Sequence, residues 1–301
     1  MQISPIGKKT CFMAFLFFIL SIVVFPGYMA WEGETPRLTV LRLEGAPDNI
    51  VFIADPHIRD ENIDTTRTAI EKINQLHPSL VLIGGDFTTH GGEEDLPLQK
   101  IWEEIDAPVY AVLGNHDYQA GIEGSGAPGR IAWTLESFLR SRGFYGGPLY
   151  SDPGITSPDA LEEILENSGV TVLHNEWREL DINGQQVILC GVDDIWAGRA
   201  DPPAVPDTGA FAIWLVHEPV YRPEWNADLI LSGHTHGGQV SNGVFMIIDN
   251  LGFADIRGIS HKGDTVMYVT RGIGTSKTGN DYRLFTSPEI VLINPAPLQG
   301  L

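Results

Sequence analysis

The 301-residue chain contains only two cysteines, Cys11 and Cys190. Cys11 lies in an apolar N-terminal run, which leaves Cys190 without a partner, so a fold held together by disulfides is excluded. Basic residues are also scarce, because 19 Lys and Arg stand against 39 Asp and Glu, for a net charge of −20. A chain of that charge repels long polyanions, and we therefore expect no nucleic-acid partner.

The chain also lacks internal repeats, low-complexity tracts and the composition of a disordered protein. Hydrophobic residues make up 43% and charged residues 19%, so the chain can bury a sizeable core. We expect one large folded domain over 32–301, preceded by a separate segment over 1–31.

The segment over 1–31 has the properties of a membrane-spanning helix. Lys8 and Lys9 precede a stretch from 10 to 31 that contains no charged residue. A helix of that length measures about 33 Å, enough to cross a bilayer core of about 30 Å. A cleaved signal peptide is the alternative. Cleavage after Ala30 would place the bulky Tyr28 where a small residue is required, so we favour an uncleaved anchor.

The flanking charges do not decide the orientation of this anchor. Lys8 and Lys9 precede it and Arg37 and Arg42 follow it, so the positive-inside count is tied. A very short basic N-terminal tail before a single span usually stays in the cytoplasm. We therefore predict a single-pass membrane protein whose domain is extracytoplasmic.

Short apolar runs with the length and β-branched content of buried strands recur along the body. They cover 50–54, 80–84, 109–113, 187–190, 211–216, 229–231, 264–270 and 289–293. Between the first two runs, apolar residues at spacings of three and four predict an amphipathic helix over 64–76. Alternating strands and helices predict an α/β fold with layered elements.

Five of these runs are followed by a carboxylate, an amide or an imidazole. In chain order the side chains are Asp55 and His57, Asp86, Asn115 with His116 and Asp117, His217, and finally His234 and His236. Ligands bind beyond the carboxyl ends of strands in open α/β sheets, so we expect these side chains to converge. The glycines beside Asp86, Asn115 and His234 allow the backbone to approach a crowded centre.

Imidazole, carboxylate and amide groups without thiolates suit divalent ions such as Mn, Fe or Zn. One shared carboxylate can hold two such ions about 3.5–4 Å apart, as in two-metal hydrolases. The pattern therefore predicts a dinuclear metal centre at the strand ends.

In order and spacing, the series Asp55-x-His57, Gly85-Asp86, Gly114-Asn-His-Asp117, His217 and Gly233-His-Thr-His236 resembles the calcineurin-like metallophosphoesterases. The longer run from Gly233 to Gln239 and the later segments 271–276 and 283–290 are similar to the membrane-attached bacterial branch of that family. This branch includes pyrophosphatases that split UDP-diacylglucosamine. The resemblance implies two stacked mixed β-sheets flanked by helices, the four-layer sandwich of the family.

The resemblance also implies a role for each residue of the series. One cation would be held by Asp55, His57 and His236, the second by Asn115, His217 and His234, and Asp86 would bridge the two. His116 would face the phosphoryl group, stabilising its charge or protonating the leaving oxygen. Asp117 would accept a hydrogen bond from His116 and fix the orientation of its ring.

We therefore expect a metal-dependent hydrolase that cleaves a phosphodiester or pyrophosphate bond, with a phosphorylated small molecule or a lipid-linked compound such as UDP-diacylglucosamine as substrate. An extracytoplasmic domain conflicts with that example, because nucleotide sugars are cytosolic. The first alternative is therefore a cell-envelope phosphodiesterase or phosphatase acting on glycerophosphate-type esters. A non-catalytic metal-binding adaptor is a second alternative, but no residue of the expected site is missing.

Three further features of the sequence carry expectations of their own. The stretch 118–170 is an insertion that forms either a cap, with Phe144, Tyr145 and Tyr150 shaping a pocket, or a packing subdomain. His90 is expected in a surface loop. Asp193 and Asp194 also follow a strand, where they could orient the metal ligands from behind, and we favour the alternative of an ordinary solvated turn.

Overall fold

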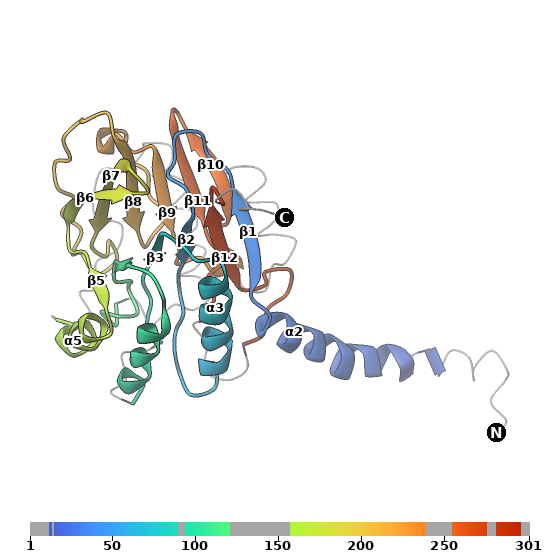
Figure 1. Cartoon of the computed structure of the whole chain (residues 1–301). Coiled ribbons are helices and arrows are strands. Elements are labelled where there is room, and N and C mark those ends of the chain that lie inside the picture. Colours follow the sequence, from blue (N-terminus) through green and yellow to red (C-terminus); the bar gives the residue numbers. More distant parts are fainter. Residues whose placement is uncertain are drawn as a thin grey trace, which may run out of the picture.

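Figure 1 shows the computed structural model, which describes residues 12–13, 15–89, 94–120, 157–238, 255–275 and 281–295. Its strands form two six-stranded sheets, with the order β1-β12-β2-β3-β4-β5 in sheet A and β10-β11-β9-β8-β7-β6 in sheet B. Each sheet mixes parallel and antiparallel neighbours. The prediction of two stacked mixed sheets is confirmed.

The strands of sheet A are β1 (Arg37–Leu41), β2 (Ile50–Ile53), β3 (Leu80–Ile83), β4 (Val109–Ala111), β5 (Val170–Val172) and β12 (Glu289–Ile293). Those of sheet B are β6 (Glu176–Ile182), β7 (Gln185–Val192), β8 (Phe211–Val216), β9 (Leu229–Ser232), β10 (Gly258–Lys262) and β11 (Thr265–Val269). The helices are η1 (Leu20–Val24), α2 (Phe25–Gly33), α3 (Ile63–Gln75), η2 (Leu96–Glu104), α5 (Asp159–Asn167), η3 (Pro223–Trp225) and η4 (His236–Gly238).

Alternation along the strands separates the core into layers. In β2, Ile50 and Phe52 pack between the two sheets, whereas Val51 and Ile53 pack on the opposite face of sheet A. All four side chains are fully buried, which explains why this run is apolar throughout rather than alternating. Burying each such side chain stabilises the fold by about 1.5–3 kcal/mol, so the central strands hold their ends in a rigid frame.

Helices cover the outer face of sheet A. The helix α3 places Ala69, Ile70 and Ile73 on that face, as its spacing predicts. The outer face of sheet B is covered, within the described residues, by loops and the single turn η3, whose Trp225 stacks on Trp214 with ring centroids 4.8 Å apart. Cys190 is buried in the same layer as a free thiol, as expected for a small apolar side chain.

One apolar helix precedes the sheets and extends away from them (Figure 1). It runs from Phe15 to Gly33, and by length and composition alone it could cross a membrane or serve as a signal sequence. Its hydroxyl at Ser21 donates to the carbonyl oxygen of Phe17 (2.9 Å), so this polar group is satisfied within the helix.

The end of the predicted insertion over 118–170 belongs to the main core. Leu161 and Leu165 of α5 are buried in the cluster that covers sheet A. The three aromatic residues that we expected to shape a pocket lie outside the described residues, as does His90. The cap over 118–170 therefore stays a prediction.

Candidate metal centre

The strand ends bring together all seven residues for which we expected a metal role. Asp55 and His57 follow β2, Asp86 follows β3, and Asn115 lies beyond β4 in sheet A. From sheet B, His217 follows β8, and His234 and His236 come after β9. Because β2, β3 and β4 are parallel to one another, as are β8 and β9, their carboxyl ends meet at one edge of the sandwich.

Their ligand atoms form two clusters that share one carboxylate. The first contains Asp55, His57, Asp86 and His236, and the second contains Asp86, His217 and His234. Within each cluster, one atom per residue lies within 4.8 Å of the others. Two groups of nitrogen and oxygen donors around a common carboxylate are the arrangement that a dinuclear metal centre requires.

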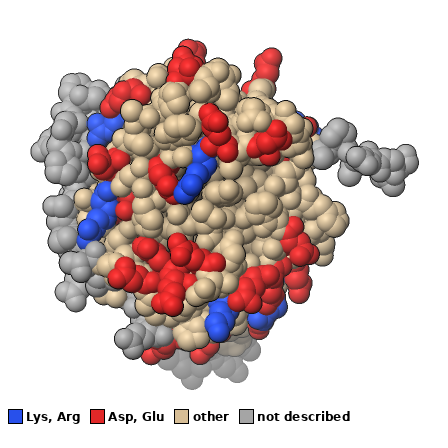
Figure 2. Space-filling model, turned by 60° about the vertical axis from the view of Figure 1, so that its left-hand side comes forward, with Lys and Arg blue, Asp and Glu red and all other residues tan. Residues whose placement is uncertain are grey.

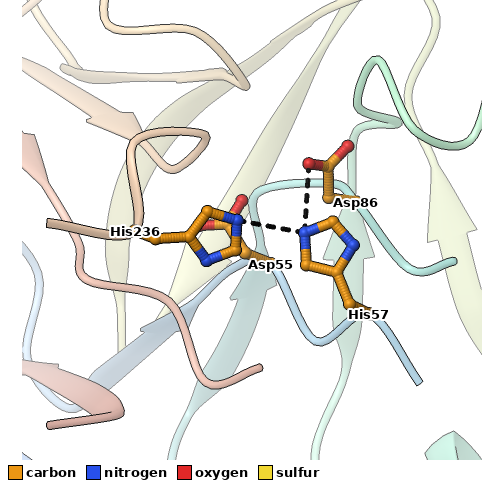
Figure 3. Close-up of side chains that lie close together, drawn as sticks. All are labelled: Asp55, His57, Asp86 and His236. Carbon is orange, nitrogen blue, oxygen red and sulfur yellow. Dashed lines mark hydrogen bonds and ion pairs between the residues drawn. The ribbon is translucent and has the colours of Figure 1, made fainter. Parts of the chain in front are cut away.

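In the first cluster, backbone carbonyls determine which nitrogen of each histidine ring carries the hydrogen. His57 Nδ1 lies 2.8 Å from the oxygen of Thr88, and His236 Nδ1 lies 3.2 Å from the oxygen of Gly274. Each Nδ1 therefore carries the hydrogen, and each Nε2 presents a lone pair. These two lone pairs face each other at 3.1 Å (Figure 3), a contact that a cation stabilises.

The second cluster is oriented in the same way. His217 Nδ1 donates to the carbonyl oxygen of Gly84 (2.7 Å), which leaves Nε2 to face Asp86 Oδ2 at 3.3 Å. Asn115 Nδ2 donates to the oxygen of Ala120 (2.8 Å), so its Oδ1 points toward His234 Nδ1 at 3.0 Å. The side chains of His57, His236, His217 and Asn115 are thus each fixed by a backbone carbonyl on the far side from the cluster, as is usual for metal ligands.

An unpartnered oxygen at Asp55 supports the same conclusion. The Oδ1 of Asp55 accepts a hydrogen bond from the backbone N–H of His234 (2.8 Å). Its Oδ2 is fully buried and has no hydrogen-bond donor among the described residues. A buried carboxylate oxygen without a donor is costly, and a divalent cation would satisfy it. The residues present therefore fit a metal centre.

Burial and neighbouring charges set the protonation of these groups. Burial lowers the pKa of His236 to about 3 and the pKa values of His57 and His234 well below the ordinary value, so these rings are neutral near pH 7. Although burial opposes its ionisation, the imidazoles of His217 and His116 hold the pKa of Asp86 well below its usual range. Three neutral imidazoles and the ionised Asp86 are therefore in the forms that bind a cation. His217 differs, because Asp86 and Asp55 hold its pKa well above the ordinary value although burial opposes this, so a cation would displace a proton from this ring.

The backbone of the site is left-handed at five of the seven residues. The φ angles are 53° at Asp55, 41° at His57, 58° at Asp86, 67° at His234 and 50° at His236. Non-glycine residues adopt this region at a cost of about 1–3 kcal/mol each, and such strain is concentrated at functional sites. Close packing adds to it, because a Cβ at Gly114 would lie 2.3 Å from Asp86 Oδ1. The expectation that glycine permits this approach is confirmed.

The expected contact between His116 and Asp117 is wrong. His116 Nδ1 lies against the carbonyl oxygen of Thr89, so that carbonyl orients the ring. The carboxylate of Asp117 instead accepts from the backbone N–H groups of Thr88 (2.9 Å) and Gly114 (3.0 Å). Two backbone donors on a buried carboxylate outweigh one contact to a ring, so Asp117 holds together the loops that carry Asp86 and Asn115.

Sequence reasoning assigned no role to two buried arginines beside the first cluster. Arg59 donates to the carbonyl oxygens of Thr275 (2.7 Å) and His57 (3.3 Å) and pairs with Asp281. Arg283 is fully buried and donates to the carbonyl oxygen of Gly274, the same oxygen that orients His236. The only signal in the sequence was the position of Arg283 in the segment 283–290, which carried no indication of its contacts.

The interpretation of Asp193 and Asp194 as a solvated turn is also wrong. Asp194 is fully buried and Asp193 is 8% exposed. The loop that they begin is tied to Glu218, whose carboxylate accepts from the backbone N–H groups of Ile195 and Trp196. This loop places the ring of Trp196 against His234, with centroids 4.6 Å apart, so it forms one wall of the second cluster.

A separate charged group joins this loop to α5. His174 lies 3.4 Å from both the Glu162 and the Asp193 carboxylates, and these contacts, the bond to Asp193 first, raise its pKa to about 10. A raised pKa in the folded state stabilises the protein fully below the unfolded value of about 6.5, and this stabilisation is lost as the pH rises toward 10.

We therefore expect His174→Gln to lower the melting temperature more at pH 6 than at pH 10. The ring is 38% exposed, so solvent screening keeps the difference small. Thermal unfolding of both proteins at pH 6, 8 and 10 measures it. A difference in melting temperature that stays the same across this range would contradict the role of charge.

Acidic side chains predominate over basic ones on the described surface in one view of the molecule. On the face shown in Figure 2, acidic side chains are spread widely, and the few basic ones form no continuous patch. The acidic composition of the whole chain points the same way.

Comparison with known proteins identifies relatives of the chain. The sequence profile named calcineurin-like phosphoesterase matches residues 49–238, a span that includes both clusters. Phosphodiesterase YaeI of Escherichia coli K12 is 27% identical over 283 residues, which cover 89% of this chain and 88% of YaeI.

Two further proteins extend the comparison. UDP-2,3-diacylglucosamine pyrophosphatase LpxG of Chlamydia muridarum is 28% identical over 283 residues, which cover 81% of this chain and 82% of LpxG. Among solved structures, phosphopantetheinyl hydrolase from Mycobacterium tuberculosis aligns with 85% of this chain and 99% of its own at 12% identity, with a TM-score of 0.43.

Proposed function

Because this chain belongs to the calcineurin-like phosphoesterase family, we propose that its metal-dependent hydrolysis acts on a phosphodiester or pyrophosphate bond of a lipid-linked substrate. The observation that carries the proposal is the pair of buried donor clusters that share Asp86, in a domain preceded by an apolar helix. This combination supports our proposal that the chain belongs to the membrane-attached bacterial branch of the family.

The donor atoms divide between two cations. In our assignment Asp55, His57 and His236 would hold the first cation, Asn115, His217 and His234 would hold the second, and Asp86 would be shared between them. Two divalent ions, of which Mn, Fe and Zn suit these donors, supply Lewis-acid stabilisation of the phosphoryl group and lower the pKa of water. The protein contributes the rigid strand ends and the far-side hydrogen bonds that orient each ligand.

The chain itself supplies the proton donor for the leaving oxygen. His116 follows Asn115, and its ring lies 4.7 Å from that of His57 at an interplanar angle of 82°. Its Nδ1 hydrogen is committed to the Thr89 carbonyl, so proton exchange takes place at Nε2. The backbone N–H of His116 donates to Asp86 Oδ1 (2.9 Å), which fixes its position relative to the bridging carboxylate. In this assignment Asp117 positions the loops and does not take part in proton transfer.

The end of the apolar helix supports an anchor that is kept rather than cleaved. The backbone N–H of Arg283 donates to the carbonyl oxygen of Met29 (3.1 Å), so the helix contacts the domain upstream of the Ala30 cleavage point. Removal of Met29 would break this contact. This contact supports our proposal that the helix is kept as a single membrane span, and the extracytoplasmic position of the domain stays a prediction from the short basic N-terminal tail.

A second candidate is a cell-envelope phosphodiesterase that acts on glycerophosphate-type esters. The similarity to phosphodiesterase YaeI over 89% of the chain favours it, and it agrees with an extracytoplasmic domain better than a nucleotide sugar does. The adaptor alternative gains no support, because no ligand of either cluster is replaced.

A substrate panel tests the proposal. The full chain is purified in detergent, stripped with a chelator and reloaded with Mn, Zn or Mg, and is then assayed on UDP-2,3-diacylglucosamine, a glycerophosphodiester and an aryl phosphomonoester. We expect turnover only after reloading, with the lipid pyrophosphate hydrolysed fastest. Faster hydrolysis of the glycerophosphodiester would select the second candidate. Hydrolysis of the monoester alone would contradict the lipid-linked proposal and select the phosphatase form of the second candidate.

A further inference from the structure

The end of helix α2 is built into the folded domain rather than joined to it by a linker. Glu32 is 3% exposed, and its carboxylate accepts from Ser287 Oγ (2.9 Å) and from the backbone N–H of Phe285 (3.0 Å). A Cβ at Gly33 would lie 1.6 Å from the carbonyl oxygen of Asp281, so the helix packs directly on this segment. The helix and the segment 281–287, here named the Phe285 loop, therefore form one rigid unit.

The same loop contacts the metal centre. Arg283 donates its backbone N–H to helix α2 at Met29 and its guanidinium to the Gly274 carbonyl that orients His236. One arginine residue thus contacts the apolar helix through its backbone and the support of the first cluster through its side chain. Asp281 pairs with Arg59, which also donates to the carbonyl oxygen of His57. The metal site consequently has a fixed position relative to the helix axis.

An exposed aromatic side chain lies at the tip of this loop. Phe285 is 61% exposed and has a φ of 57°, a conformation that costs a bulky residue about 1–3 kcal/mol. Its backbone is held on both sides, because its N–H donates to Glu32 and its carbonyl accepts from Arg257 Nη1 (3.1 Å). The protein therefore maintains a strained backbone in order to hold a large apolar ring in an exposed position.

Two more aromatic rings lie on the last turns of the helix beside this loop. Tyr28 is 38% exposed and Trp31 is 54% exposed, and their ring centroids are 5.8 Å apart. The helix continues from them into an exposed apolar surface from Phe15 to Phe25. Aromatic residues at the end of an apolar helix are typical of the boundary between lipid headgroups and acyl chains.

We propose that Phe285, together with Tyr28 and Trp31, forms a membrane-interface contact that holds the metal site at the level of the lipid headgroups. The occupant is the lipid surface, because Tyr28 and Trp31 lie at the end of an apolar helix long enough to cross a bilayer, and Phe285 is exposed on the loop that packs against this end of the helix. The inference rests on the proposed anchor. It implies that a phosphoester carried on a lipid headgroup reaches the cations without leaving the membrane.

A single labelled cysteine tests the contact. In the full chain with Cys11→Ser, the buried Cys190 stays unreactive because burial raises its thiol pKa to about 12. Phe285→Cys is labelled with a polarity-sensitive dye and the protein is reconstituted in phosphatidylcholine and phosphatidylglycerol vesicles. Glu166→Cys, exposed on α5 and distant from the helix in Figure 1, is the matched control.

We expect a blue shift and a loss of quenching by aqueous iodide at position 285 but not at position 166. Equal iodide quenching at the two positions would overturn the interface contact. Vesicle flotation and hydrolysis of a soluble aryl phosphodiester are measured on the same samples. Loss of flotation would refute the anchor, and loss of hydrolysis would refute the proposed function, so the three failures are distinguishable.

Discussion

Replacing Asp86 with asparagine is expected to reduce kcat at least about 10³-fold, because Lewis-acid stabilisation by the cations contributes several kcal/mol and each 1.36 kcal/mol is a factor of ten. Asp86 is the one residue common to both clusters. A neutral amide of the same size can still accept the backbone N–H of His116, so folding is retained, but it cannot balance two divalent charges. Metal content measured by atomic emission should fall together with kcat.

The matched control for this variant is Asp228→Asn. Asp228 also accepts a hydrogen bond from a backbone N–H, that of Ala212 (2.7 Å). It directly precedes β9, so it lies at the opposite end of the strands from the metal ligands. Its replacement should leave both kcat and metal content unchanged. An Asp86→Asn protein that keeps two bound cations and full turnover would contradict the bridging assignment.

Replacing His116 with glutamine is expected to reduce kcat about 10²–10⁴-fold, the contribution of a positioned general acid, without loss of metal. His116 belongs to neither donor cluster. The loss should be largest for an alkyl leaving group, which requires protonation, and smallest for a nitrophenolate, which leaves without it. Rates for an alkyl and an aryl phosphodiester with the same metal loading measure the difference.

His174→Gln serves as the control. It also removes an imidazole, but His174 contacts Glu162 of α5 and belongs to neither cluster. Its rates on the two substrates should match those of the unmodified protein. Equal losses on both leaving groups in His116→Gln, accompanied by loss of metal, would assign His116 to metal binding instead of proton donation.

The central strands could be predicted because burial on both faces makes them apolar throughout. This holds for β2, β3, β8 and β9, and the position of the site follows from their ends. The edge strands β6 and β10 could not be predicted in this way. The sequence of β6 is rich in charge, and it becomes a strand because β7 offers it a complete ladder of hydrogen bonds.

The identity of the site residues could be predicted, but their mutual support could not. The order of carboxylates and imidazoles is visible in the sequence, whereas the carbonyl partners of His57, His116 and His236 come from loops that are distant or lack any motif. The burial of Asp194 was missed for the same reason, since it depends on packing around Glu218 rather than on neighbouring residues. The spacing of the motifs indicates which side chains converge, but which ring nitrogen of each histidine faces the metal site depends on tertiary packing.

The left-handed backbone conformation of the ligand residues costs conformational stability, and the ligands that adopt it are needed for activity. Asp55, Asp86 and His234 each occupy a conformation that glycine would adopt without strain, yet glycine would supply no donor atom. Drift toward a more heat-resistant chain would therefore favour glycine at these positions and erase the centre. A glycine at one of these positions would relieve the local strain and keep both sheets, but it would remove a ligand of the centre.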